Sequence, residues 1–216
     1  MTSTFDPLCL DAPGHGNNTN GARPLPQCAD DIATSMKAGI LVGYSMGARM
    51  ALHVALQHPE MVRQLVLISG TPGLKTDAER SARIQSDCEL ANRIEKIGTP
   101  AFIDEWLALP MFSGLSSETN QKSDRLRNTT QGLADSLRFA GTGTQESHWP
   151  NLHRLSMPVH LIVGELDEKF TSIAREMKTL ISTSELIVVE NAGHTVHLEN
   201  TTTTAQLLDS IMLRND

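Results

Sequence analysis

The chain has 216 residues, of which 39% are hydrophobic and 20% charged, so it can build a sizeable core in one domain, with room for a subdomain. The formal net charge of −7 and the lack of a basic run argue against a general nucleic-acid or membrane surface. Three cysteines, Cys9, Cys28 and Cys88, lack metal-ligand spacing and favour free thiols in a reducing compartment. No apolar stretch reaches the ~18 residues of a membrane span and no signal peptide opens the sequence, so we expect a soluble, cytoplasmic protein.

Short apolar runs alternate with helix-like segments along the chain. We expect strands at Pro7–Leu10, Ile40–Val42, Gln64–Ser69, Pro158–Val163 and Leu186–Val189. We expect helices at Ala29–Met36, Ala48–His58 and Thr203–Leu213. This alternation predicts an α/β fold whose mostly parallel sheet has helices on both faces.

The stretch from about Leu74 to Leu152 differs, because it is helical and mixed-polar and lacks strand-like runs. Helices are expected at Asp77–Ile97 (as one or two), Pro100–Leu109 and Ser123–Phe139. We therefore predict a discontinuous core of residues 1–73 and 153–216 that carries a helical cap of residues 74–152.

The most informative stretch is Gly43-Tyr44-Ser45-Met46-Gly47, which stands between an expected strand and an expected helix. Gly-x-Ser-x-Gly in this context predicts a nucleophile elbow, with a catalytic Ser45 at the top of the sheet. The backbone N–H of Met46 is then the natural first oxyanion donor. The alternative is a Gly-rich loop whose serine only caps the helix.

A serine nucleophile or base needs an imidazole that a carboxylate orients. Asp167 follows the expected strand Pro158–Val163, and His194 follows the expected strand Leu186–Val189. Both therefore belong at the carboxyl edge of the sheet, where ligands bind in open α/β folds. Taken alone, Asp167 could be an ordinary turn or helix-cap residue, and His197 could be confused with His194. Together with Ser45 they predict a Ser45–His194–Asp167 triad.

These motifs resemble the α/β-hydrolase fold and, within it, the 2-succinyl-6-hydroxy-2,4-cyclohexadiene-1-carboxylate synthases, lyases of menaquinone or phylloquinone biosynthesis. The resemblance rests on the runs VGYSMGARMAL, SGTPGL, RNTTQGLADSLRFAGTGTQ, VGELDEKF and AGHTVHLEN, and it covers about residues 5–200. It implies that the triad removes a proton alpha to the succinyl carbonyl of an enolpyruvyl-cyclohexene substrate, after which pyruvate is eliminated. Ser45, activated by His194, would be the base.

The resemblance also implies a small-molecule substrate with three carboxylates, for which arginine is the natural partner. Arg49 stands four residues after Ser45, and Arg83 and Arg127 match carboxylate binders of the family. The alternatives are a solvated helix arginine for Arg49 and surface roles for the other two, with Arg80 and Arg125 as neighbours that a small alignment error could substitute.

Two aromatic residues complete the predicted pocket. Trp106 matches an aromatic residue of the family's pocket, although it could equally pack between cap helices, and Tyr44 would line the site beside the serine. No metal or organic cofactor is implied, because no carboxylate or cysteine cluster completes a site around the histidines. No nucleic-acid or membrane partner is expected either.

The chain departs from the family pattern at its beginning. Only ten residues precede Asp11 of the Asp-x-Pro-Gly-His-Gly turn, whereas members normally have earlier strands and a loop that supplies the second oxyanion donor. We therefore expect an α/β-hydrolase sheet without its first strands. Two alternatives stay open: a serine esterase or C–C bond hydrolase with the same triad, and a non-catalytic relative that only binds ligands or partners.

Overall fold

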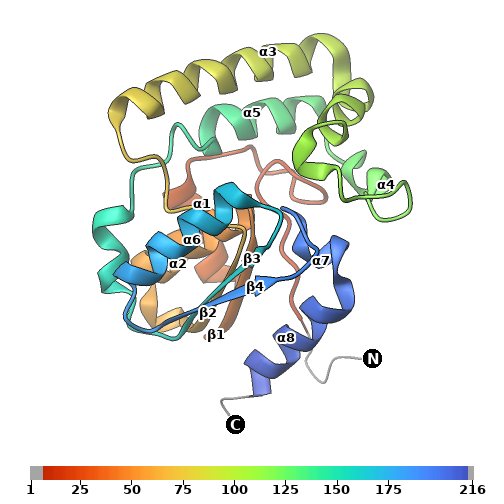
Figure 1. Ribbon diagram of the computed structural model, residues 1–216. Helices are drawn as coiled ribbons and strands as arrows, with labels where there is room; N and C mark the ends of the chain where they lie inside the picture. The colour runs from red at the N-terminus through yellow and green to blue at the C-terminus, as the bar shows by residue number, and fades with distance from the viewer. Residues whose placement is uncertain (1–6, 214–216) are drawn as a thin grey trace.

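The computed structural model describes residues 7–213 and contains one four-stranded parallel sheet. The strands lie in the order β1 (Gly39–Tyr44), β2 (Val62–Ile68), β3 (Val159–Gly164) and β4 (Ser184–Val189). Each of the four lies within two residues of the range expected from its apolar run. The parallel arrangement brings the carboxyl ends of all four strands to one edge of the sheet, as Figure 1 shows.

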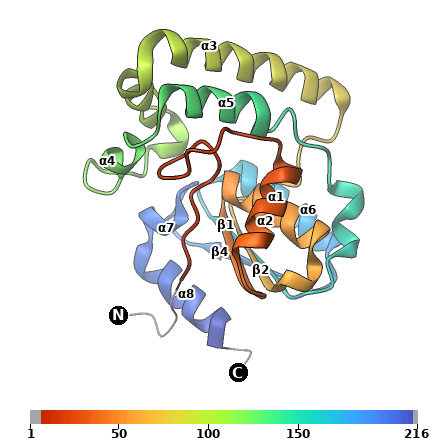
Figure 2. The same cartoon turned by 180° about the vertical axis from the view of Figure 1, so that it is seen from behind.

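Helices cover both faces of this sheet. On one face α1 (Leu25–Ser35), α2 (Met46–Gln57) and α6 (Glu168–Leu180) pack on Leu65, Leu67 and their neighbours, and on the other α8 (Thr201–Leu213) packs on Val66 and Ile68. Successive residues of β2 thus face opposite cores, which explains why its sequence is a continuous apolar run and not an alternating one. Figure 2 shows α1 and α2 together on their face, with α8 away from them.

The expected strand at Pro7–Leu10 is wrong. Residues 7–10 have no regular secondary structure and are exposed, with Leu8 66% and Leu10 45% accessible. A strand needs a neighbour for its N–H and C=O groups. Among the described residues β1 pairs only with β2, so this segment has no strand beside it to complete a ladder.

A helical layer lies above the carboxyl edge of the sheet (Figure 1). It consists of α3 (Asp77–Leu107), α4 (Lys122–Arg125) and α5 (Thr130–Ala140), and α3 and α5 lie side by side in both ribbon views. Their apolar residues form a core of their own around Ala91, Ile94 and Ala134. The exact cap boundaries, 74 and 152, stay a prediction.

Local signals explain how the cap helices begin and break. Thr76 and Glu79 form a reciprocal capping box at the start of α3. Gly98, with φ 78°, interrupts α3, so the expectation of two successive helices here is confirmed. The expected helix Ser123–Phe139 is split into α4 and α5, because the Thr129 side chain accepts the N–H of Gly132 and starts a new helix.

Short turns complete the described chain. These are η1 (Pro59–Met61), η2 (Pro110–Phe112), η3 (Trp149–Arg154) and α7 (Val196–Glu199). No disulfide links the cysteines within the described part, where Cys9, Cys28 and Cys88 are free thiols. None of the helices between residues 7 and 213 is long and apolar enough to cross a membrane.

Candidate active site

Ser45 occupies a sharp turn between β1 and α2. Its backbone has φ 49° and ψ −106°, a conformation that L-residues rarely adopt, and its N–H donates to the carbonyl of Ile68 at 2.9 Å. Gly43 makes this turn possible, because a Cβ there would lie 2.3 Å from the carbonyl oxygen of Gly47. A Cβ on Gly47 itself would meet nothing within 4 Å, so only the first glycine of the motif is required by space. The arrangement is that of a nucleophile elbow.

The loops after β3 and β4 are held against each other. Leu166 donates its N–H to the carbonyl of Ala192 at 2.9 Å. Gly164 lies so close to this loop that a Cβ there would come within 2.2 Å of two of its carbonyl oxygens. These contacts fix the distance between the aspartate of the first loop and the histidine of the second.

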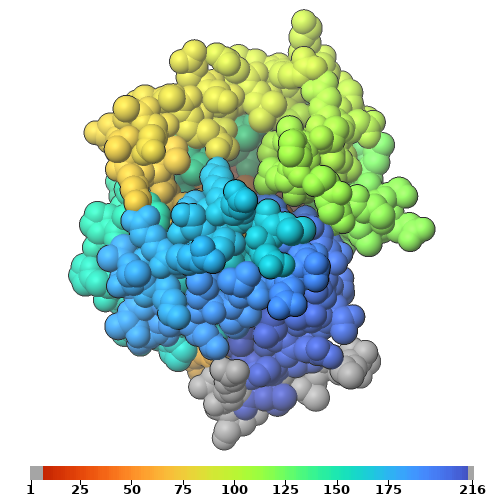
Figure 3. Space-filling view, viewed as in Figure 1, coloured from red at the N-terminus to blue at the C-terminus, as the bar shows by residue number. Residues whose placement is uncertain are grey.

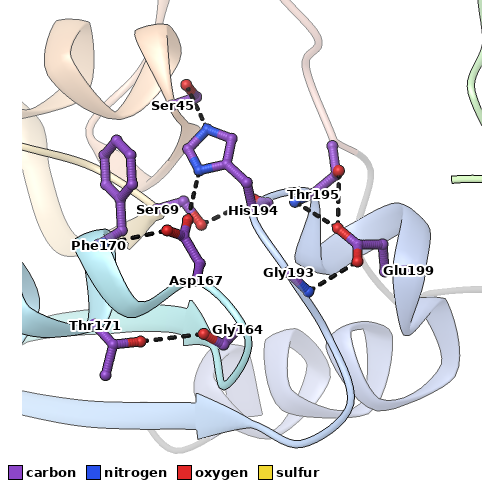
Figure 4. A network of polar contacts seen from close by, with 10 residues as sticks. All are labelled: Ser45, Ser69, Gly164, Asp167, Phe170, Thr171, Gly193, His194, Thr195 and Glu199. Carbon is purple, nitrogen blue, oxygen red and sulfur yellow. Dashed lines mark hydrogen bonds and ion pairs between the residues drawn. The ribbon is translucent and has the colours of Figure 1, made fainter. Parts of the chain in front are cut away.

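Ser45, His194 and Asp167 form a continuous hydrogen-bonded chain, drawn in Figure 4. Ser45 Oγ lies 3.1 Å from His194 Nε2, and His194 Nδ1 lies 2.7 Å from Asp167 Oδ2. The histidine is 3% exposed, so water does not compete for these contacts. Asp167 also caps α6, because its Oδ1 accepts the N–H of Phe170 at 3.3 Å. The contact with His194 and the helix cap therefore coexist, one on each carboxylate oxygen, and a catalytic role of Asp167 stays a prediction.

Aromatic rings enclose the imidazole. The ring centroid of Phe170 lies 4.6 Å from that of His194, and the centroid of Tyr44 lies 5.5 Å away. Tyr44 also contacts His197, at 4.5 Å between centroids. Burial lowers the pKa of His197, and the positive charge of Arg125 lowers it further. His197 is therefore neutral near pH 7 and packs beside the site.

Arg49 is buried in the first turns of α2, one turn beyond the serine, and is 7% exposed. Its Nη1 donates to Gln145 Oε1 at 3.4 Å, and it forms no ion pair with the other described residues. The amide Nε2 of Gln145 is also buried without a hydrogen-bond partner. Burial, followed by repulsion from Arg83, lowers the pKa of Arg49, and Asp87 opposes this effect. Arg49 thus has no carboxylate partner within the described residues, and the Gln145 amide that contacts it has no acceptor there.

Arg83 of the cap lies near Arg49 of the core. Its Nε donates to Asp87 Oδ1 at 2.7 Å, and its two terminal nitrogens form no hydrogen bond with the other described residues. Two guanidinium groups and one buried carboxylate leave this cluster with a net positive charge, although the chain as a whole carries −7. Such a cluster favours an anionic ligand.

Comparisons with known proteins show which family this chain resembles. The alpha/beta hydrolase family model matches residues 2–207. A protein of Bacillus subtilis (strain 168), named provisionally as a 2-succinyl-6-hydroxy-2,4-cyclohexadiene-1-carboxylate synthase, is 42% identical over 88% of this chain and 71% of its own length. The synthase of that name from Enterobacter sp. (strain 638) is 32% identical over 96% of this chain and 82% of its own length.

The chain belongs to this synthase family of α/β hydrolases. The solved structure of MenH from S. aureus superposes with a TM-score of 0.85, at 29% identity over 95% of this chain and 80% of that one. A thermophilic esterase from Thermogutta terrifontis superposes with a TM-score of 0.78 at 19% identity, which supports the fold alone. The predictions of an α/β-hydrolase fold and of the synthase family are therefore confirmed.

Arg127 and Trp106, which the resemblance also implies, belong to the helical layer above the sheet. Arg127 is exposed and lies 3.8 Å from Asp124, and within residues 7–213 it forms no hydrogen bond or ion pair with the triad or with Arg49. Its neighbour Arg125 is half-buried, and its positive charge acts on Tyr44. A role of Arg127 in binding a substrate carboxylate stays a prediction, and Arg125 is the better-placed guanidinium of the two.

Trp106 packs inside the cap. Its ring centroid lies 5.6 Å from that of Phe102 and 5.8 Å from that of Phe112. Phe112 in turn lies beneath the Arg125 guanidinium, at 5.3 Å. Trp106 therefore supports the segment that carries Arg125, and direct contact with a substrate stays a prediction.

On the face seen in Figure 3, the surface is hollowed between the start of α3 and the segment around α4.

Two residues of the site escaped sequence reasoning. Ser69, with φ 48° and no exposed surface, donates its hydroxyl to the carbonyl oxygen of His194 at 2.9 Å. Glu199 accepts hydrogen bonds from the loop on both sides of His194. The signal for Ser69 was its place at the end of a buried strand, and the signal for Glu199 was a carboxylate five residues after the histidine.

Within residues 7–213, no group of three or more histidine, cysteine, aspartate or glutamate side chains is arranged so that it could hold a metal ion.

Proposed function

We propose that this chain eliminates pyruvate from 2-succinyl-5-enolpyruvyl-6-hydroxy-3-cyclohexene-1-carboxylate, the reaction of the synthases with which it shares 32–42% identity. The observation that best supports this function is that two functional groups, the Ser45 hydroxyl and the Arg49 guanidinium, lie together at the start of α2. Ser45 carries the hydrogen-bonded chain to His194 and Asp167, and Arg49, one turn further, is a buried guanidinium without a carboxylate partner in the described part of the chain. A neutral ester substrate would leave that charge uncompensated, whereas an anionic substrate compensates it.

The first step is removal of the ring proton at C2, alpha to the succinyl carbonyl. Ser45 takes the proton as its own proton passes to His194 Nε2, and Asp167 stabilises the imidazolium that forms. The electron pair of the broken C–H bond moves onto the carbonyl oxygen as an enolate. Met46 is the first residue of α2, so its N–H is one of the four that a helix leaves without an internal acceptor, and it is the proposed donor to that oxygen.

The second step follows from the positions of the double bonds in the substrate and the product. The double bond at C3 of the cyclohexene becomes the 2,4-diene, so the enolate electrons form C2=C3, the C3=C4 pair moves to C4=C5, and the C5–O bond breaks. The leaving oxygen departs as the enolate of pyruvate, which takes a proton on carbon. The His194 imidazolium supplies that proton and becomes neutral again. Ser45 keeps the proton taken from C2 as its hydroxyl proton, so both side chains return to their starting state.

The arginines bind the carboxylates that do not react. Arg49 is proposed to bind one of them beside the serine, and Arg83, whose Nε is fixed by Asp87, offers its two terminal nitrogens to another. The third carboxylate is assigned to the region of Arg125 and Arg127. Because Arg49 and Arg83 come from the core and the cap respectively, one substrate molecule would bridge the two layers. We expect the reaction to take place in the cytoplasm.

A serine esterase with the same triad is the competing function, since the hydrogen-bonded chain alone suits both. Replacement of Arg49 distinguishes the synthase from the esterase. The synthase predicts that Arg49→Met lowers pyruvate release from the tricarboxylate substrate and leaves hydrolysis of a neutral p-nitrophenyl ester as it was. Equal losses on both substrates, or efficient ester hydrolysis with no pyruvate release by the wild-type chain, would favour the esterase.

A further inference from the structure

Glu199 is the last residue of α7, the short helix that follows His194 (Figure 4). Its Oε1 accepts the backbone N–H of Thr195 at 2.9 Å and the Thr195 hydroxyl at 2.9 Å. Its Oε2 accepts the backbone N–H of Gly193 at 2.8 Å. One carboxylate therefore holds the two peptide N–H groups that flank the proposed catalytic histidine.

Capping of α7 would explain only part of this arrangement. A helix cap requires the contact to Thr195, the residue before the helix, and not the contact to Gly193, six residues before Glu199. The second contact spans His194, whose own carbonyl oxygen accepts the Ser69 hydroxyl at 2.9 Å. The loop is thus fixed at three consecutive residues, with the imidazole projecting from the middle one.

The cap touches the same carboxylate. A Cβ built on Gly114, in the turn after η2, would lie 2.0 Å from Glu199 Oε2 and 2.7 Å from its Cδ. The backbone of the cap therefore packs directly on the group that holds the histidine loop. Gly114 does not have a positive φ, so its backbone conformation itself accepts alanine.

We propose that Glu199 is the positioning residue of His194, and that the cap bears on the histidine through the contact of Gly114 with this carboxylate. The inference rests on the proposed triad and depends on no particular substrate. A catalytic base must lie within hydrogen-bond reach of its partner, and a displacement of about 1 Å can cost about 10²-fold in rate. Movement of Glu199 changes the path of the loop at Gly193 and Thr195 and so moves the imidazole away from Ser45.

Glu199→Gln tests the positioning role. Glutamine keeps the shape but replaces one accepting oxygen with an NH₂ group, which opposes one of the flanking N–H donors. We expect kcat for pyruvate release to fall about 10- to 100-fold with KM unchanged. The rate at which a fluorophosphonate labels Ser45 should fall by a similar factor, and this readout needs the triad but not the synthase substrate. If the chain released no pyruvate, the labelling rates would still decide the role of Glu199.

Two further variants separate positioning from general stability. Glu165→Gln is the matched control, because Glu165 also accepts a backbone N–H of this loop, from Asn191 at 3.2 Å, but does not flank the histidine. It should label at the wild-type rate. Gly114→Ala should reproduce the loss seen in Glu199→Gln, although it substitutes no residue of the histidine loop, because the added Cβ displaces the Glu199 carboxylate. Wild-type labelling and kcat in Glu199→Gln, an increase in KM alone, or an equal loss in Glu165→Gln would overturn the proposal.

Discussion

Arg49→Met should separate stability from activity. Arg49 is 7% exposed, and the one hydrogen bond of its guanidinium within the described residues, to Gln145, is 3.4 Å long. Replacing a buried charge that lacks an ionic partner with an apolar side chain of similar length is neutral or stabilising. We expect a gain of zero to about 1 kcal/mol in the free energy of unfolding, which corresponds to about 0–4 °C in Tm for a chain of this size.

The same change should weaken catalysis. A hydrogen bond between charged groups contributes about 1.5–3 kcal/mol, so its loss lowers kcat/KM by about 10- to 150-fold. The assays are pyruvate release by coupled lactate dehydrogenase and thermal unfolding followed by circular dichroism. Arg138→Met is the control, because Arg138 is a cap arginine paired with Glu95 at 2.6 Å, and it should keep wild-type kcat/KM. A fall in Tm of several degrees for Arg49→Met with unchanged kcat/KM would refute the reasoning, since the arginine would then serve the fold.

Three other outcomes follow from the site and its surroundings. Asp167→Asn should lower kcat about 10³- to 10⁴-fold in the pyruvate assay, because the amide disfavours the required imidazole tautomer. Asparagine still caps α6, so Tm should stay within a few degrees of the wild-type value. Unchanged kcat would exclude Asp167 from the triad. Gly43→Ala should lower the free energy of unfolding, measured in urea, by about 2–4 kcal/mol, because the added Cβ would lie 2.3 Å from the Gly47 carbonyl oxygen. Gly47→Ala, whose Cβ would meet nothing within 4 Å, should lower it by less than about 0.5 kcal/mol. Similar losses in both variants would contradict the elbow geometry. Burial lowers the pKa of His53, whose Nε2 lies 2.9 Å from His148 Nε2, to about 4, so the unfolded chain binds the extra proton between pH 6.5 and about 4. The free energy of unfolding should therefore fall by about 3 kcal/mol as the pH drops through that window, and urea titrations of His53→Gln should lack this loss; an identical pH dependence in the variant would contradict the assignment.

The four strands of the sheet and the hydrogen-bonded arrangement of Ser45, His194 and Asp167 could be predicted from the sequence because local pattern determines them. A buried parallel strand needs a continuous apolar run, and the elbow needs glycine beside the serine, so both leave marks within a few residues. Asp167 and His194 could be found because each directly follows such a run. The segment 7–10 has a similar local pattern, but pairing depends on a neighbouring strand, and sequence periodicity does not report one.

Residues that act through tertiary contacts were not predictable in this way. Ser69 meets His194 across 125 residues, and its role depends on the crossing of two loops. Arg125 and Arg127 differ by two positions, yet Arg125 is half-buried whereas Arg127 is exposed near Asp124, and the local sequence pattern does not distinguish them. Glu199 needed the fold of the loop to show that its two oxygens reach both sides of the histidine.

We propose that Ser45 and His194 remove a proton from the tricarboxylate substrate, after which pyruvate is released. The most direct test is the initial rate of pyruvate release by the purified 216-residue chain, with Ser45→Ala measured beside it. We expect saturable release by the wild-type chain and a loss of about 10³-fold or more in the variant. Release at the same rate from both proteins, or none from a folded wild-type chain, would contradict it.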